Sequence, residues 1–97
     1  MSPALTLPTI KRRATGVLKT HGIKRAGLFG SAARNQLKPS SDVDILIETG
    51  GKMGLIEMVG LKLKLEASLG RKVDLVEFKA VKPTFAKQVA RDYVAVI

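Results

Sequence analysis

Cysteine is absent from this chain of 97 residues, which excludes disulfide bonds and thiolate metal sites. Aromatic residues are scarce, at 4% of the sequence, so a platform for stacking single-stranded bases is not expected. No apolar run approaches the roughly 20 residues of a membrane span. The basic residues near the N-terminus follow its short apolar stretch, which is the reverse of a secretory signal. We therefore expect a cytoplasmic protein with no membrane partner.

The length of the chain limits what it can build. We expect one domain, spanning residues 1–97, with a single modest core. A deep pocket with walls on all sides is harder to build at this size. Any chemistry should therefore sit in an open cleft that a partner could complete.

Positive charge dominates the composition, with 17 Lys and Arg against 8 Asp and Glu and a net charge of +9. Such a balance favours polyanionic partners, namely nucleotides, nucleic acid or an acidic protein surface, and does not choose among them. The basic run Lys11-Arg12-Arg13 is more typical of a solvated helix face than of a binding patch. No specific motif supports a nucleic-acid partner.

The hydrophobic pattern predicts four helices that alternate with three strands. The helices are expected over 10–21, 31–36, 55–69 and 83–91, and the strands over 23–29, 43–47 and 73–78. Gly22 and Gly70 are expected to end the first and third helices in the left-handed conformation, and Pro83 opens the last. Residues 38–41, with Pro39, should form a loop, and 92–97 a short tail. The order predicts an α/β (α+β) domain with a small mixed sheet covered by helices.

The third predicted helix is apolar on more than one side. Its core-facing set is taken as Leu55, Ile56, Val59, Leu63 and Leu69, with Met58, Leu61 and Leu65 beside them. Two interpretations stay open. The helix either lies fully buried in the monomer, or covers the core on one side and meets a partner on the other.

Two aspartates open the clearest strand. Asp42 and Asp44 share one face of it because side chains two residues apart point the same way. Val43, Ile45 and Ile47 then share the other face. Two adjacent carboxylates repel and raise one pKa, and a bound Mg²⁺ would remove that penalty. Taken alone, the pair is more often a turn residue followed by an exposed one.

Two further features point to the same end of the sheet. Gly30 and Ser31 stand where a strand gives way to a helix, where backbone N–H groups can hold an anion and Ser31 can serve as N-cap. Asp74 lies inside an otherwise apolar strand, which is costly unless it has a partner or faces water at an edge. If its strand adjoins that of Asp44, the three carboxylates can converge.

In combination these residues resemble a known family. Gly30-Ser31, ten intervening residues and Asp42-Val43-Asp44 look like the signature of the DNA polymerase β-like nucleotidyltransferases. The stretches 28–34 and 41–47 resemble its minimal nucleotidyltransferase (MNT) branch, and 65–66, 69–76 and 82–83 continue the similarity. One departure is Asn35, where the family usually has Gly. We expect little damage, since Asn tolerates the left-handed backbone.

The resemblance implies roles for these residues. Asp42 and Asp44 would ligate two Mg²⁺ ions, and Asp74 would complete the metal site and help to deprotonate the acceptor. Gly30 and Ser31 would hold the triphosphate. Arg34 is a further candidate for nucleotide binding, or else a solvated helix residue.

The resemblance also implies a function: transfer of a nucleoside monophosphate, AMP from ATP, to a tyrosine of a partner HEPN toxin, with this chain as antitoxin. Two alternatives stay open, a small-molecule acceptor or silencing by contact without catalysis. Self-association also stays open. His21 is interpreted as a helix-end residue and Tyr93 as a packing residue rather than as catalytic groups.

Overall fold

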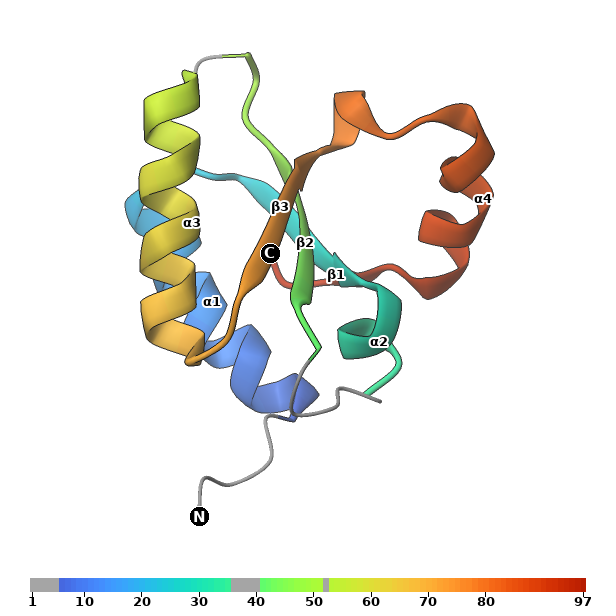
Figure 1. The fold of residues 1–97 in the computed structure, drawn as a ribbon, viewed down its shortest axis with the longest axis horizontal. Coiled ribbons are helices and arrows are strands. Elements are labelled where there is room, and N and C mark those ends of the chain that lie inside the picture. Colours follow the sequence, from blue (N-terminus) through green and yellow to red (C-terminus); the bar gives the residue numbers. More distant parts are fainter. Residues whose placement is uncertain (1–5, 36–40, 52) are drawn as a thin grey trace.

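The computed structural model describes residues 6–35, 41–51 and 53–97 (Figure 1). In chain order its elements are α1 (Leu7–Thr20), β1 (Arg25–Phe29), α2 (Gly30–Ala33), β2 (Val43–Glu48), α3 (Leu55–Leu69), β3 (Val73–Glu77), the 3₁₀ helix η1 (Phe78–Ala80), α4 (Pro83–Asp92) and β4 (Val94–Ala95). The predicted alternation of helices and strands is confirmed. The loop expected at 38–41 falls mostly outside the described residues.

The strands form one mixed sheet in the order β3-β2-β1-β4. β1 pairs antiparallel with β2 and with β4, whereas β2 and β3 run parallel. The expectation of three strands was wrong by one, because Val94 and Ala95 add a fourth beside Gly27 and Leu28. Two residues are too short to show a period of two, so the sequence pattern could not distinguish this strand from a tail.

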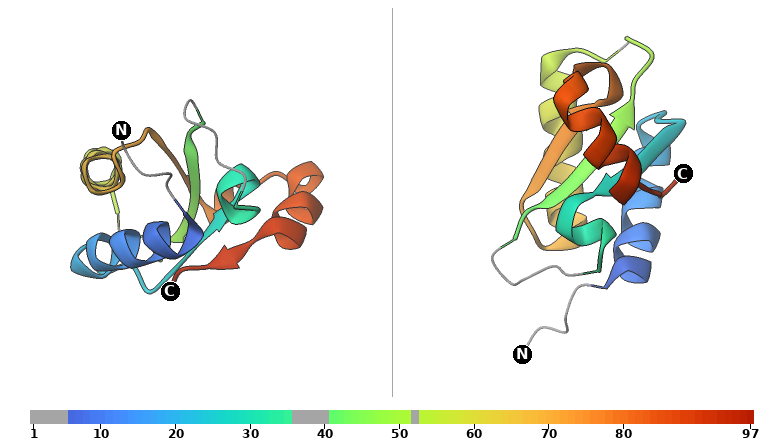
Figure 2. Two further views of the ribbon diagram at one scale, coloured as in Figure 1. Left: turned by 90° about the horizontal axis from the view of Figure 1, so that it is seen from below. Right: turned by 90° about the vertical axis from the view of Figure 1, so that its right-hand side faces the viewer.

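The sheet separates two unequal layers. α1 and α3 cover one face, and α2 and α4 lie on the other (Figure 2). The hydrophobic core lies mainly in the first layer, and α2 adds Ala32 and Ala33 to it. Its residues are Ile10, Ala14, Leu18, Ile23, Ala26, Leu28, Ala32, Ala33, Val43, Ile45, Ile47, Leu61, Leu65, Leu69 and Val73. By contrast, none of the α4 side chains that the structure describes is fully buried. The stability of the fold therefore comes mainly from the α1–α3 side.

The core-facing side of α3 differs from the prediction. Leu61, Leu65 and Leu69 are the buried residues, at the i, i+4, i+8 spacing of one helix face. Of the set expected in the core, only Leu69 is buried, while Leu55, Ile56, Val59 and Leu63 are all exposed, Ile56 by 88%. Because α3 carries apolar residues on both sides, the sequence did not show which side is buried. Packing against α1 determines it. Complete burial of α3 in the monomer was therefore wrong.

The glycines predicted to end α1 and α3 and the proline predicted to open α4 are confirmed, whereas α1 begins three residues before the predicted Ile10 and α2 spans Gly30–Ala33 rather than 31–36. Gly22 and Gly70 take φ values of +75° and +68°, the left-handed conformation that ends α1 and α3. His21 caps α1, with its ring Nδ1 2.9 Å from the carbonyl oxygen of Val17. Pro83 is the first residue of α4. Among the described helices, none is long and apolar enough to cross a bilayer.

Tyr93 is a packing residue, as predicted. It joins α4 to β4, and its ring lies 5.6 Å from that of Phe78. It also covers the backbone of β1, because a Cβ atom added to Gly27 would stand only 2.3 Å from the ring. Burial raises the pKa of the Tyr93 hydroxyl, which the Arg25 guanidinium only partly offsets. A glycine at position 27 is thus what lets the C-terminal segment close onto the sheet.

We predict that Gly27→Ala lowers the free energy of unfolding by about 1–3 kcal/mol, because the new methyl group overpacks against Tyr93. Gly16→Ala, on the exposed side of α1 where an added Cβ meets nothing within 4 Å, should instead stabilise by about 0.5–1 kcal/mol. Urea denaturation measures both. A Gly27→Ala protein as stable as the wild type would contradict the packing described for Tyr93.

Candidate active site at the end of the sheet

The register of the sheet brings the predicted carboxylates to one place. Asp44 pairs with Phe29 of β1 on one side and with Asp74 of β3 on the other. The prediction that the strand of Asp74 adjoins that of Asp44 is confirmed. β3 is also an edge strand and Asp74 is exposed. Asp74 therefore both faces water at a sheet edge and lies beside the strand of Asp44. Asp42 is exposed and directly precedes β2.

Electrostatics single out Asp44 within this group. Burial and, to a smaller extent, the neighbouring charges of Asp74 and Asp42 together raise its pKa from 3.8 to about 6. Both causes disfavour the ionised carboxylate, and the positive charge of a cation bound nearby would counteract their effect on the pKa. The raised pKa of one aspartate, expected from the sequence, is therefore found at Asp44.

Three carboxylates are the hard oxygen donors that Mg²⁺ takes, so the chemistry of the donor set fits this ion. Within the described ranges, no three acidic or histidine side chains gather closely enough to form a complete metal cage. Full convergence of Asp42, Asp44 and Asp74 is thus not observed. Mg²⁺ commonly takes only one or two protein carboxylates and completes its shell with phosphate and water, so the partial set still suits a metal that arrives with a nucleotide.

Two features of Gly30 require a glycine beside Asp44: its backbone conformation and the close approach of the Asp44 carboxylate. Its φ of +69° is a left-handed conformation, and a Cβ added there would lie 2.7 Å from Oδ2 of Asp44. The chain therefore turns at Gly30, and α2 begins there rather than after Ser31. The prediction of Ser31 as N-cap was wrong: Phe29 occupies that position, and it forms no side-chain cap hydrogen bond. Ser31 lies in the first turn instead, half-exposed.

Asn35 stands where the resembled family usually has glycine, and, as expected, it adopts the backbone conformation that glycine would. Asn35 has φ +54°, the one positive φ of a non-glycine residue in the described part of the chain. Its side chain also accepts a hydrogen bond of 3.1 Å from the backbone N–H of Leu7, at the start of α1. Asn thus supplies the backbone conformation that Gly would give, and adds a tie between α2 and α1.

An open cleft of about 170 Å³ adjoins these residues. It is lined by Phe29, Gly30, Asp44, Phe85, Val89 and Asp92. The last three come from α4 and were missed as site residues. Their i, i+4, i+7 spacing marks one side of a helix, but only the tertiary structure shows that this side faces Asp44. Arg34, the other predicted residue, forms an ion pair with Asp92, 2.8 Å between Nη1 and Oδ2.

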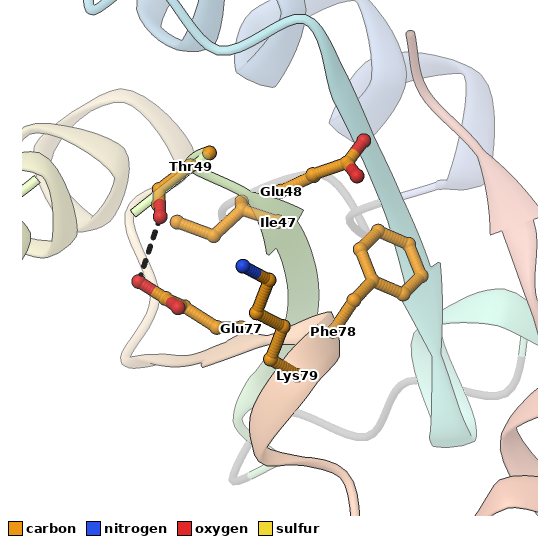
Figure 3. A pocket seen from close by; sticks show the side chains of 7 residues that line it. Ile47, Glu48, Thr49, Glu77, Phe78 and Lys79 are labelled. Atoms are coloured by element: carbon orange, nitrogen blue, oxygen red, sulfur yellow. Dashed lines mark hydrogen bonds between the residues drawn. The ribbon is translucent and has the colours of Figure 1, made fainter. Parts of the chain in front are cut away.

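A second hollow lies at the opposite ends of β2 and β3 (Figure 3). There the Thr49 hydroxyl donates a hydrogen bond of 2.9 Å to Glu77, and Lys79 and Phe78 close the sides. Its volume of about 20 Å³ is on the order of one water molecule. It is far too small for a nucleotide, and we assign it no function.

Comparison with known proteins identifies the family. The profile described as polymerase beta, nucleotidyltransferase matches residues 13–97. This chain is a member of that nucleotidyltransferase family. The resemblance seen in the motifs at Gly30-Ser31 and Asp42-Val43-Asp44 is thereby confirmed, together with the fold that it implied.

Two relatives are similar over most of their length. MJ0435 of Methanocaldococcus jannaschii, provisionally named a protein adenylyltransferase, is 39% identical over 96% of this chain and all of its own. The protein adenylyltransferase MntA of Thermococcus cleftensis is 41% identical over 77% of this chain and 76% of its own. The members of the nucleotidyltransferase family that resemble this chain in sequence are thus named as enzymes.

Solved structures show the same fold. One, provisionally described as a minimal nucleotidyltransferase, superposes with a TM-score of 0.81 at 32% identity and covers 96% of this chain and 98% of its own. Another is a complex of a tri-AMPylated HEPN toxin with its MNT antitoxin from Shewanella oneidensis. It aligns with a TM-score of 0.73 at 20% identity, over 95% of this chain and 72% of its own. At that identity the likeness concerns the fold alone.

We predict that Asp44→Asn stabilises this nucleotidyltransferase in a pH-dependent way. Because the folded-state pKa of Asp44 lies above its ordinary value, the free energy of unfolding falls as pH rises from about 4 to about 6, and it stays lowered above that range. The asparagine amide of Asp44→Asn does not ionise, so the variant does not lose this free energy of unfolding. With a discount for the half-exposed position, we expect a gain of about 1 kcal/mol at pH 8, or about 4–8 °C in Tm.

At pH 3, below the ordinary pKa of 3.8, the wild-type carboxyl is protonated in both the folded and the unfolded chain, so the two proteins should melt at similar temperatures. Thermal denaturation with EDTA present, which removes divalent cations, makes the comparison. Equal stabilisation at both pH values would show that the effect does not come from ionisation of Asp44.

Proposed function

We propose that this nucleotidyltransferase transfers AMP from ATP, with Mg²⁺, to a tyrosine of a partner HEPN toxin and so acts as its antitoxin. The observation that carries the proposal is the pairing of Asp44 with Asp74 on adjacent parallel strands, directly beside the Gly30 turn. That pairing supports the proposal, because carboxylate oxygens suited to a metal lie beside a turn without a side chain, which a phosphate could approach.

The carboxylates are proposed as the metal ligands, with Asp42 and Asp44 holding the ions and Asp74 completing the site. When bound, Mg²⁺ would supply positive charge for the attacking and departing oxygens of phosphoryl transfer. Asp74, exposed at the sheet edge, is the carboxylate that an acceptor hydroxyl can reach from solvent. We assign it the role of taking up the hydroxyl proton.

Gly30 and Ser31 are proposed to hold the β- and γ-phosphates. Gly30 brings bare backbone to the edge of the cleft, and the Ser31 hydroxyl adds a donor. α2 is a single turn of four residues, so its dipole is weak. Direct hydrogen bonds from backbone N–H groups, rather than the helix field, would provide the binding.

A protein acceptor fits the cleft better than a small molecule does. Pockets that enclose small ligands usually measure about 300–1,000 Å³. The cleft beside Asp44 measures about 170 Å³, so a nucleotide held there leaves no further space that could enclose a small acceptor. An acceptor presented by another protein needs no such enclosure. The names of the relatives MJ0435 and MntA, and the AMPylated toxin in the Shewanella complex, support the same choice.

The function is tested by label transfer from α-³²P-ATP, with Mg²⁺, to the HEPN-type protein that co-purifies with this chain. We expect label on that protein with the wild type and a loss of at least a hundredfold with Asp42→Asn/Asp44→Asn, which should still fold. Glu57→Gln, which removes an exposed carboxylate on α3 away from the cleft, should label like the wild type.

Stable binding of the co-purified protein without any label would contradict nucleotidyl transfer and leave silencing by contact. Label on a purified small acceptor such as an aminoglycoside, with none on the protein, would contradict the protein acceptor alone.

A further inference from the structure

Arg34 and Asp92 join the two helices that lie on the catalytic face of the sheet. Arg34 directly follows α2, Asp92 is the last residue of α4, and Nη1 of the arginine lies 2.8 Å from Oδ2 of the aspartate. The Asp92 side chain is 16% exposed and lines the cleft, whereas that of Arg34 is 44% exposed. A half-exposed cation is therefore held by a largely covered carboxylate at the wall of the candidate active site.

This arrangement is unusual for a cleft that accepts a triphosphate. Asp44 already lies in the cleft, with Asp42 and Asp74 close enough to act on its charge. Asp92 adds another carboxylate to the same space. On charge alone it repels phosphate, and its removal should tighten nucleotide binding. A carboxylate in this position therefore needs a role that outweighs the repulsion.

The role can come from its effect on Arg34. An unrestrained arginine side chain loses rotamer entropy when it is fixed against a ligand. Asp92 fixes it in advance by holding the guanidinium against a carboxylate that itself lines the cleft. A guanidinium carries five N–H donors in a planar fork, so it can contact a carboxylate and a phosphate at the same time.

We propose that Asp92 is a positioning residue for the triphosphate, acting through Arg34, whose guanidinium it holds at the wall of the cleft. This inference rests on the proposed function, because it takes a nucleoside triphosphate as the ligand. It also explains why a carboxylate of α4 lies in this cleft, and it assigns to the last turn of α4 a part in nucleotide binding.

The test is the Kd of the non-hydrolysable analogue AMP-PNP with Mg²⁺, measured by isothermal titration calorimetry on the full chain. Asp92→Asn keeps the shape of the side chain and removes its charge. We expect it to weaken binding about tenfold, as much as Arg34→Gln does, and the double variant to be no weaker than either single one. Asp92→Glu should recover part of the affinity.

Glu57→Gln is the matched control, since it removes one carboxylate from α3 on the opposite side of the sheet, and its Kd should be that of the wild type. Circular dichroism and Tm verify that each variant is folded. Should Asp92→Asn not fold, Arg34→Lys keeps the ion pair but lacks the planar fork, and it should weaken binding in the same direction.

The sign of the change decides the outcome. Tighter or unchanged binding by folded Asp92→Asn, with nucleotide bound by the wild type, would overturn the positioning role and leave the proposed function intact. A change in Tm without a change in Kd would mean that the ion pair only anchors α4, and would overturn it too. A wild type that binds no nucleotide would overturn both proposals.

Discussion

The pairing of Asp44 with Asp74 across two parallel strands is the constraint on which the rest of this structure depends. A half-buried carboxylate beside two others is unfavourable when ionised, and its raised pKa records that cost. Other features are fitted around it. Gly30 leaves room for its oxygen, and Phe85, Val89 and Asp92 of α4 line the cleft beside it.

One face of the sheet carries most of the hydrophobic core, and the other carries the candidate site. The face covered by α1 and α3 holds the apolar core, so it can support unfavourable charges on the other face. On the face that carries the candidate site, Leu46 is fully buried, while α4 contributes no fully buried side chain that the structure describes. The exposed apolar residues of α3, among them Ile56, lie on the far side of the core from Asp44.

Local patterns predicted much of this structure. β2, α3 and the glycine stops follow from period, composition and φ preference, and the site motifs pointed to Asp44, Asp74 and Gly30. Features that depend on tertiary contacts were not predictable. Packing against α1 set the buried side of α3, the pairing of β4 depends on two residues without a pattern, and Asp92 becomes a cleft residue only when α4 lies beside α2.

The central claim, that these carboxylates accept a divalent cation, is tested most directly by paramagnetic broadening of amide resonances with Mn²⁺, which takes the same oxygen ligands as Mg²⁺. At substoichiometric Mn²⁺ the account predicts selective broadening at Gly30, Ser31, residues 42–44 and Asp74, with none along the exposed side of α3. Asp44→Asn should abolish the effect. Broadening centred on Glu48 and Glu77, at the other end of the strands, or spread evenly over the acidic residues, would contradict it.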